Sequence, residues 1–223
     1  MTWTEVADLS APVVLVPVGS FEQHGPHLPL DTDTRIAEAL CDELQSLLAI
    51  DSVIAPSIGV SASGEHQGFP GTLSIGTHTT VAVLVELARS ADWARGVVFV
   101  NGHGGNADAL AAASRTLRDE GCAVFFWSPK SEATDDAHAG FTETSVMLYL
   151  APELVNMDAA ERGNVHAVSA LAERLRREGV RAVSDNGVLG DPRRADAAEG
   201  ERIFQRWLGD LVAACKRIWP EQP

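Results

Sequence analysis

Two short, nearly continuous apolar runs, at residues 13–18 and 96–100, constrain the fold of this chain more than any other feature. Runs of this length without polar alternation are typical of strands that are buried on both faces of a parallel sheet. We expect further strands at residues 53–55 and 123–127, and helices at residues 35–48, 77–91, 107–120, 166–178 and 195–219, with one more around Glu143. This alternation predicts an α/β fold: a three-layer αβα sandwich with a mostly parallel central sheet.

Length and composition narrow the class of protein. The chain has 223 residues and 45% apolar content, and no linker or repeat interrupts it, so we expect a single domain over residues 1–223. A net charge of −14 argues against nucleic acid and anionic membrane as partners. We find no signal peptide and no apolar run that approaches the roughly 20 residues of a membrane span. The scattered Cys41, Cys122 and Cys215 fit a reducing cytoplasm better than a disulfide framework.

The loop after the first apolar run carries five groups that can bind a metal: Glu22, His24, His27, Asp31 and Asp33. Glu22 and His24 are two residues apart, so they point the same way on an extended segment. The turn at Gly25 and Pro26 lets Asp33 return to the same point. Carboxylates and imidazoles suit Zn, Mn or Fe(II), and the absence of thiolates argues against a closed structural zinc site. Alternatively, these are surface groups, with Asp33 or Thr34 capping the next helix. Two such pairs in one loop, Glu22 with His24 and Asp31 with Asp33, favour a metal-binding site over surface groups.

Two other predicted strand ends carry similar groups. His103 lies in a glycine-rich segment directly after the second apolar run, and His138 and Glu143 follow the strand at 123–127. Open α/β sheets place their sites at the carboxyl ends of strands. We therefore expect these groups to converge on one metal centre. Taken singly, Glu143 could serve only to complement a helix dipole, and His138 could be a loop histidine that bonds to the backbone.

The loop at residues 56–72 is long and polar for a compact domain. Such loops are often functional. Composition alone leaves a functional loop and an ordinary crossover equally open. If it is functional, we expect Ser63, Glu65 and His66 to contact the substrate.

Together these motifs resemble the creatininase family of metal-dependent amidohydrolases. The resemblance covers roughly residues 12–210 and rests on the segments 22–33, 64–72, 101–106, 138–145 and 187–191. Within the family, residues 28–36 and 71–77 are most like a branch of peptidases that trim a ribosomally made, enzymatically modified precursor peptide. Such a peptidase releases the crosslinked Val-Tyr-derived C-terminus, which becomes a redox cofactor.

The resemblance implies specific roles. Glu22 and His103 would bind one metal ion, His24 would bind a second, and Asp33 would bridge the two. The chain departs from creatininase proper at Gly105, where that enzyme has a glutamate ligand. We expect Glu143 to supply the missing carboxylate. The departure also puts creatinine in doubt as the substrate.

These roles predict metal-assisted amide hydrolysis, with His138 and Glu143 as catalytic residues and His138 carrying the proton. We expect His27 and Asp31 to orient ligands by hydrogen bonds. The alternatives are a small-molecule amidase of the same family, acting on a creatinine-like cyclic amide or a formamide, and a metal-binding protein without turnover. A sugar- or nucleotide-binding protein is disfavoured, because no phosphate loop is present.

The resemblance also bears on cofactors and partners. It implies two divalent ions, with Fe(II) or Zn(II) favoured over Mn(II). The implied substrate is a modified ribosomal precursor peptide, and the implied assembly is a homo-oligomer, a hexamer or octamer built from dimers. The apolar face of the C-terminal helix is a possible interface between its subunits.

Overall fold

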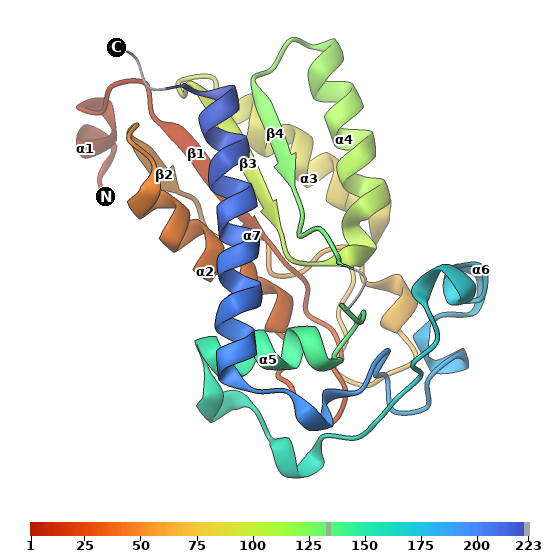
Figure 1. Ribbon diagram of the computed structural model, residues 1–223. Coiled ribbons are helices and arrows are strands. Elements are labelled where there is room, and N and C mark those ends of the chain that lie inside the picture. The colour runs from red at the N-terminus through yellow and green to blue at the C-terminus, as the bar shows by residue number, and fades with distance from the viewer. Residues whose placement is uncertain (133–134, 221–223) are drawn as a thin grey trace.

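The computed structural model describes residues 1–132 and 135–220 and contains a four-stranded sheet (Figure 1). Its strands are β1 (Val13–Val18), β2 (Ser52–Ile54), β3 (Gly96–Asn101) and β4 (Val124–Trp127), in the spatial order β2-β1-β3-β4. All three neighbouring pairs are parallel. The α/β class and the parallel sheet predicted from the apolar runs are therefore confirmed.

Helices cover both faces of this sheet, as the three-layer prediction requires. Side chains alternate along a strand, so one set from β1 and β3, including Leu15 and Val98, packs against α2 (Thr32–Leu47), α5 (Phe141–Leu150) and α7 (Ala197–Ile218). The other set, including Val16 and Phe99, packs against α3 (Gly76–Ser90) and α4 (Ala107–Asp119). Both central strands are buried throughout, which explains their unbroken apolar sequence.

The C-terminal helix α7 crosses one face of the sheet (Figure 1). Its apolar side chains, among them Phe204, Trp207 and Leu211, are buried in the core of this same chain. The expectation that this apolar face forms a subunit interface is therefore wrong. The apolar side chains of α7 cover this face of the sheet and so complete the third layer. Asp196 caps the first turn of the helix by accepting a hydrogen bond from the Glu199 amide.

The predicted helix boundaries shift by a few residues, and the starts of two helices bear on the site. Helix α2 begins at Thr32 and has Asp31 at its N-cap, so Asp33 lies in its first turn and neither Asp33 nor Thr34 is the cap. Helix α6 (Val168–Glu178) begins two residues later than expected, and none of its residues is buried. The remaining short elements are α1 (Trp3–Ala7) and the 3₁₀ turns η1 (Gly64–His66), η2 (Gly104–Asn106), η3 (Pro152–Leu154), η4 (Met157–Ala159), η5 (Val180–Ala182) and η6 (Pro192–Arg194). In the described part of the chain, the helices are too short or too polar to cross a membrane.

The carboxyl ends of β1 and β3 lie side by side and bring two loops together. Val18 pairs with Asn101, and the Gly102 amide donates to the Val18 carbonyl at 2.8 Å. A Cβ at Gly102 would lie 2.3 Å from the Asp33 carbonyl oxygen. Only glycine permits this approach, so the start of α2 and the loop after β3 share one point in space.

Candidate metal centre

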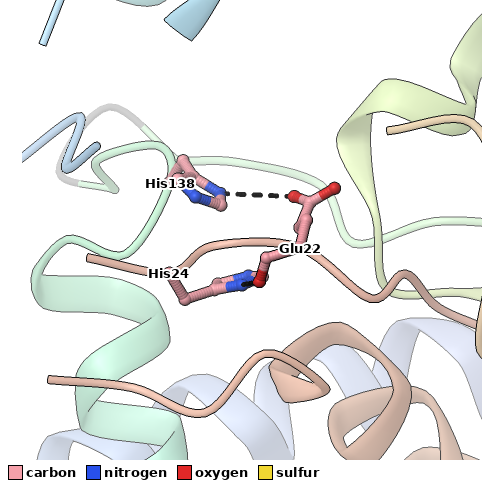
Figure 2. Close-up of side chains that lie close together, drawn as sticks. All are labelled: Glu22, His24 and His138. Atoms are coloured by element: carbon pink, nitrogen blue, oxygen red, sulfur yellow. Dashed lines mark hydrogen bonds and ion pairs between the residues drawn. The ribbon is translucent and has the colours of Figure 1, made fainter. Parts of the chain in front are cut away.

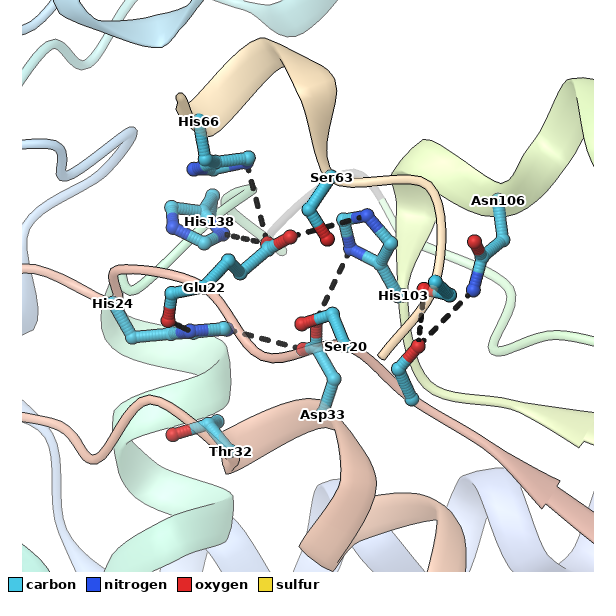
Figure 3. A network of polar contacts seen from close by, with 12 residues as sticks. Ser20, Glu22, His24, Thr32, Asp33, Ser63, His66, His103, Asn106 and His138 are labelled. Carbon is cyan, nitrogen blue, oxygen red and sulfur yellow. Dashed lines mark hydrogen bonds and ion pairs between the residues drawn. The ribbon is translucent and has the colours of Figure 1, made fainter. Parts of the chain in front are cut away.

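Glu22 lies at the centre of a cluster of buried acids and imidazoles (Figure 3). It leaves the end of β1, its side chain is 0% exposed, and neither carboxylate oxygen has a hydrogen-bond partner among the described residues. Oε1 lies 3.2 Å from His66 Nε2, and Oε2 lies 3.2 Å from His103 Nε2. A buried carboxylate without a donor is costly, and a cation among these groups would remove that cost.

Asp33 joins the two loops. Its Oδ1 lies 3.1 Å from His24 Nε2, and its Oδ2 lies 3.1 Å from His103 Nδ1 (Figure 3). The Ser20 hydroxyl donates to Oδ2 at 2.7 Å. The first turn of α2 therefore presents one carboxylate between two imidazoles that come from different strand ends.

His24 has its ring orientation set by the backbone. Its Nδ1 lies 3.0 Å from the Glu22 carbonyl oxygen and donates to it, and Nε2 faces Asp33. Glu143, from the first turn of α5, places Oε2 at 3.9 Å from the same Nε2. This Oε2 also accepts from the Ala139 amide at 2.6 Å. Ala139 has a φ of 52°, a backbone conformation that residues other than glycine rarely adopt.

These distances form two sets of ligand atoms that share Asp33. One set is Glu22, Asp33 and His103, and the other is His24, Asp33 and Glu143; within each set the ligand atoms lie within 4.8 Å of one another. A third set joins Glu22 and His24 to His138. Three carboxylates and two or three imidazoles with an open side suit a catalytic zinc, manganese or iron site.

The electrostatics of the cluster favour positive charge. Burial by itself lowers the pKa of His24 and His103, but Asp33 beside His24, and Glu22 and Asp33 beside His103, raise both pKa values to about 10. Burial raises the pKa of Glu22 to about 7. Ion pairs to Glu22 and Asp33 from the described residues come only from histidines. A site that draws protons onto two imidazoles is one where divalent ions compete well with those protons.

His138 reaches the cluster from the segment before α5, and Figure 2 shows its ring above His24 and pointing at Glu22. Its Nε2 lies 2.7 Å from the Gln23 carbonyl oxygen, which makes Nε2 the donor and leaves a lone pair on Nδ1. That Nδ1 lies 3.7 Å from Glu22 Oε1. Burial, with His24 and His66 nearby, holds the pKa of His138 well below its usual range, so the ring is neutral near pH 7.

The two residues predicted to orient ligands are placed differently. His27 is buried near the cluster, but its Nε2 pairs with the Thr144 hydroxyl at 2.9 Å and so ties the loop to α5 beside Glu143. Asp31 is not brought into the cluster: it accepts from Arg35 Nε at 2.8 Å on the outer side of α2. One helical turn separates Asp31 from Arg35, which is enough for that local pair.

Of the three residues expected to contact substrate, only Glu65 lines the large cleft above the cluster. Ser63 and His66 are buried behind it, with His66 against Glu22. The cleft has a volume of about 1720 Å³ and is also lined by Asp33, His103, His138 and Glu143.

Sequence reasoning missed residues that support the cluster. Gln23 contacts His66 Nδ1 at 2.9 Å and donates to the Gly187 carbonyl, and Ser20 holds Asp33. Asn106 donates to the Gly19 carbonyl and accepts from the Ala62 amide. The one available signal was position, because all three lie within a few residues of a predicted ligand.

Comparisons with known proteins show the family of this chain. The family model described as "Creatininase: Creatinine amidohydrolase" matches residues 1–215. The "Mycofactocin precursor peptide peptidase" of Mycolicibacterium smegmatis is 52% identical over 95% of this chain and 87% of its own length. The "Creatinine amidohydrolase" of Pseudomonas putida is 31% identical over 71% of this chain and 73% of its own length.

A solved structure supports the same grouping. A mutant creatininase described as "Zn-Zn type" superposes with a TM-score of 0.78 at 25% identity, over 99% of this chain and 97% of that one. The predicted resemblance is therefore confirmed by sequence and by fold. The chain belongs to the creatininase family of amidohydrolases, hydrolases that act on C–N bonds.

Proposed function

We propose that this protein is a metal-dependent peptidase that cleaves the modified mycofactocin precursor peptide and releases its C-terminal crosslinked Val-Tyr-derived unit. The observation that carries the proposal is the buried acid–imidazole cluster at the floor of a wide cleft, in a chain 52% identical to a mycofactocin precursor peptide peptidase. Identity to the creatinine amidohydrolase of P. putida is lower, at 31%.

The cleft suits a peptide better than a small cyclic amide. Its volume of about 1720 Å³ exceeds the roughly 300–1,000 Å³ of pockets that hold compact ligands. One wall is the face of α6 that carries Val168, Ala172 and Leu175, which are spaced to share one side of a helix. This apolar wall can receive large side chains of a modified peptide.

Two ions would be held by the two ligand sets. Glu22, Asp33 and His103 would hold one, and His24, Asp33 and Glu143 the other, so Asp33 would belong to both sets and Glu143 would replace the carboxylate missing at Gly105. Ions held there would polarise the scissile carbonyl and lower the pKa of a water molecule. Fe(II) or Zn(II) is the proposed metal, with Mn(II) as the alternative, because carboxylates and imidazoles together suit all three; the two-ion count is supported by the "Zn-Zn type" creatininase.

His138 is the proposed proton carrier. Its free Nδ1 lone pair faces the cluster, and the neutral ring can accept a proton from the attacking water and return it to the leaving nitrogen. Glu143 completes the catalytic pair, because its carboxylate faces His24 and holds the strained Ala139 next to His138.

The proposal extends to domain organisation, compartment and assembly. One domain over residues 1–223 carries the activity, and a maturation step of a ribosomal peptide fits the cytoplasm, where Cys41, Cys122 and Cys215 remain free thiols as they are here. A homo-oligomer built from dimers, a hexamer or octamer, follows the family resemblance.

Mass spectrometry of the crosslinked precursor peptide tests the function. The protein as purified should release the Val-Tyr-derived unit, a chelator should stop the release, and Fe(II) or Zn(II) should restore it. If the metal-loaded protein leaves this peptide intact, the peptidase assignment fails, and a screen of cyclic amides and formamides takes its place.

A further inference from the structure

The Glu65 side chain is more exposed to the cleft than the carboxylates of the ligand sets, of which that of Glu143 is 18% exposed. The Glu65 side chain is 29% exposed, whereas that of Glu22 is 0% exposed. Its Oε1 lies 3.6 Å from His103 Nε2, and no donor from the described residues hydrogen-bonds to its carboxylate. Its one charged neighbour among the described residues, His103, lies beyond hydrogen-bond distance, so the carboxylate keeps its acceptor positions free for a ligand in the cleft.

The backbone around Glu65 holds it in this place. The turn η1 carries it, with the His66 amide donating to the Ser63 carbonyl at 3.0 Å. The Glu65 carbonyl packs so closely on Gly179 that a Cβ there would lie 2.7 Å from it. The Glu65 position is therefore set by packing on both sides of the cleft.

The space that the carboxylate occupies exists because residue 105 has no side chain. A Cβ at Gly105 would lie 2.0 Å from Glu65 Oε1 and 2.4 Å from His103 Nε2. By contrast, a Cβ at Gly104 would meet nothing within 4 Å. Because residue 105 is a glycine, the Glu65 carboxylate from another loop can lie at the edge of the cluster.

The charge of this acid matches the charge that hydrolysis creates. Water adds its hydroxyl to the carbonyl carbon and a proton to the amide nitrogen as the C–N bond breaks, and the freed amine takes up a second proton near pH 7 to become an ammonium. The neutral substrate nitrogen thus becomes a cation. A fixed carboxylate beside this nitrogen stabilises the transition state and the product ammonium more than it stabilises the neutral bound substrate.

We propose that Glu65 is the subsite for the leaving amine: its carboxylate binds the new N-terminal ammonium of the released unit and stabilises the charge that develops on that nitrogen. The proposal rests on the peptidase function and assigns the amine side of the scissile bond to the His103 side of the cleft. Glu143 is less suited to this role, since its Oε2 already accepts from the Ala139 amide.

Binding of a product analogue tests the proposal independently of turnover. The probes are valyl-tyramine, which carries a free ammonium, and N-acetyl-valyl-tyramine, which does not; titration calorimetry with the metal-loaded protein measures both. The native protein should bind the amine roughly 10- to 100-fold more tightly, as expected for a charge-assisted hydrogen bond. The Glu65→Gln variant should lose this preference while keeping its affinity for the acetylated probe and its metal content.

Asp108→Asn is the matched control, because Asp108 is an exposed carboxylate that lines the same cleft without joining any of the ligand sets. It should keep the preference. Equal binding of both probes by the native protein, retained preference in Glu65→Gln, or loss of metal in that variant would each overturn the proposal. If the amine preference depends on Glu65 but the crosslinked peptide is not cleaved, the subsite stands and the peptidase assignment falls.

Discussion

The floor and the outer wall of the cleft are built in different ways. The floor consists of Glu22 after β1, His103 after β3 and Asp33 in the first turn of α2, all buried and each with more than one contact. The wall is α6, which has no buried residue and packs mainly on the short turns η1 and η5 (Figure 1). Catalysis needs fixed geometry, and the sheet provides it, whereas a lightly packed wall can adapt to its ligand.

The largest effect should come from replacing Asp33, because its carboxylate belongs to both ligand sets. Asp33→Asn removes one charge from both ligand sets, so we expect both ions to be lost and kcat to fall by roughly 10³-fold or more. Elemental analysis with peptide kinetics measures this. Ser20→Ala is the control: it removes only the bond to Oδ2 and should weaken metal binding by roughly 10-fold. Two tightly bound ions in Asp33→Asn would contradict the shared role.

Glu143 tests whether the floor extends beyond the sheet, because it comes from α5. Glu143→Gln should reduce the metal content from two ions per chain to one and lower kcat by roughly 10²- to 10³-fold, since one of the two ligand sets loses its charged oxygen. Thr142 is its buried neighbour, and Thr142→Ser is a suitable control that should keep both ions. Unchanged stoichiometry in Glu143→Gln would show that the missing ligand lies elsewhere.

Adjacent glycines provide a steric test at the border between floor and wall. Gly105→Ala should push Glu65 away and move the His103 ring, lowering kcat/KM by roughly 10²-fold, because small displacements of catalytic groups are expensive. Gly104→Ala should behave like the native enzyme, since its methyl group meets nothing. Equal activity of the two variants would show that the space at residue 105 is not used.

The wall should give the smallest effect. Leu175→Ala in α6 removes apolar surface from the cleft and should raise KM for the peptide several-fold, equivalent to about 1 kcal/mol of lost burial, with kcat and metal content unchanged. Glu173→Ala on the outer side of α6, where the side chain is 91% exposed, should change none of these. A fall in kcat without a change in KM would place Leu175 on the floor instead.

Much of the scaffold could be predicted because it is local. The unbroken apolar character of residues 13–18 and 96–100 predicted buried parallel strands, and both strands are buried throughout. The placement of acids and histidines directly after those strands predicted convergence, and the structure places Glu22, His24, Asp33 and His103 together. Polar groups next to buried strand ends have few directions in which to point.

The predictions that failed depended on the direction that a side chain or a helix face takes in the folded chain. Asp31 has the right chemistry to orient a ligand, but one turn of α2 directs it to Arg35. Ser63 and His66 have the composition of substrate contacts, but the fold of η1 buries them and leaves Glu65 exposed to the cleft. The apolar stripe of α7 could equally have covered a partner subunit or its own sheet, and it covers its own sheet.

By itself, the sequence determined the class of fold, the strands that carry the chemistry and the residue types of the cluster, because periodicity and adjacency along the chain are local properties. Only the tertiary structure decided that Asp33 stands between His24 and His103, that Glu143 reaches His24, and that Glu65 occupies the space beside Gly105. Apart from the contact between His24 and Asp33, these relations join segments that are far apart in the chain. They depend on how closely two loops approach, and that distance is set by packing across the sheet.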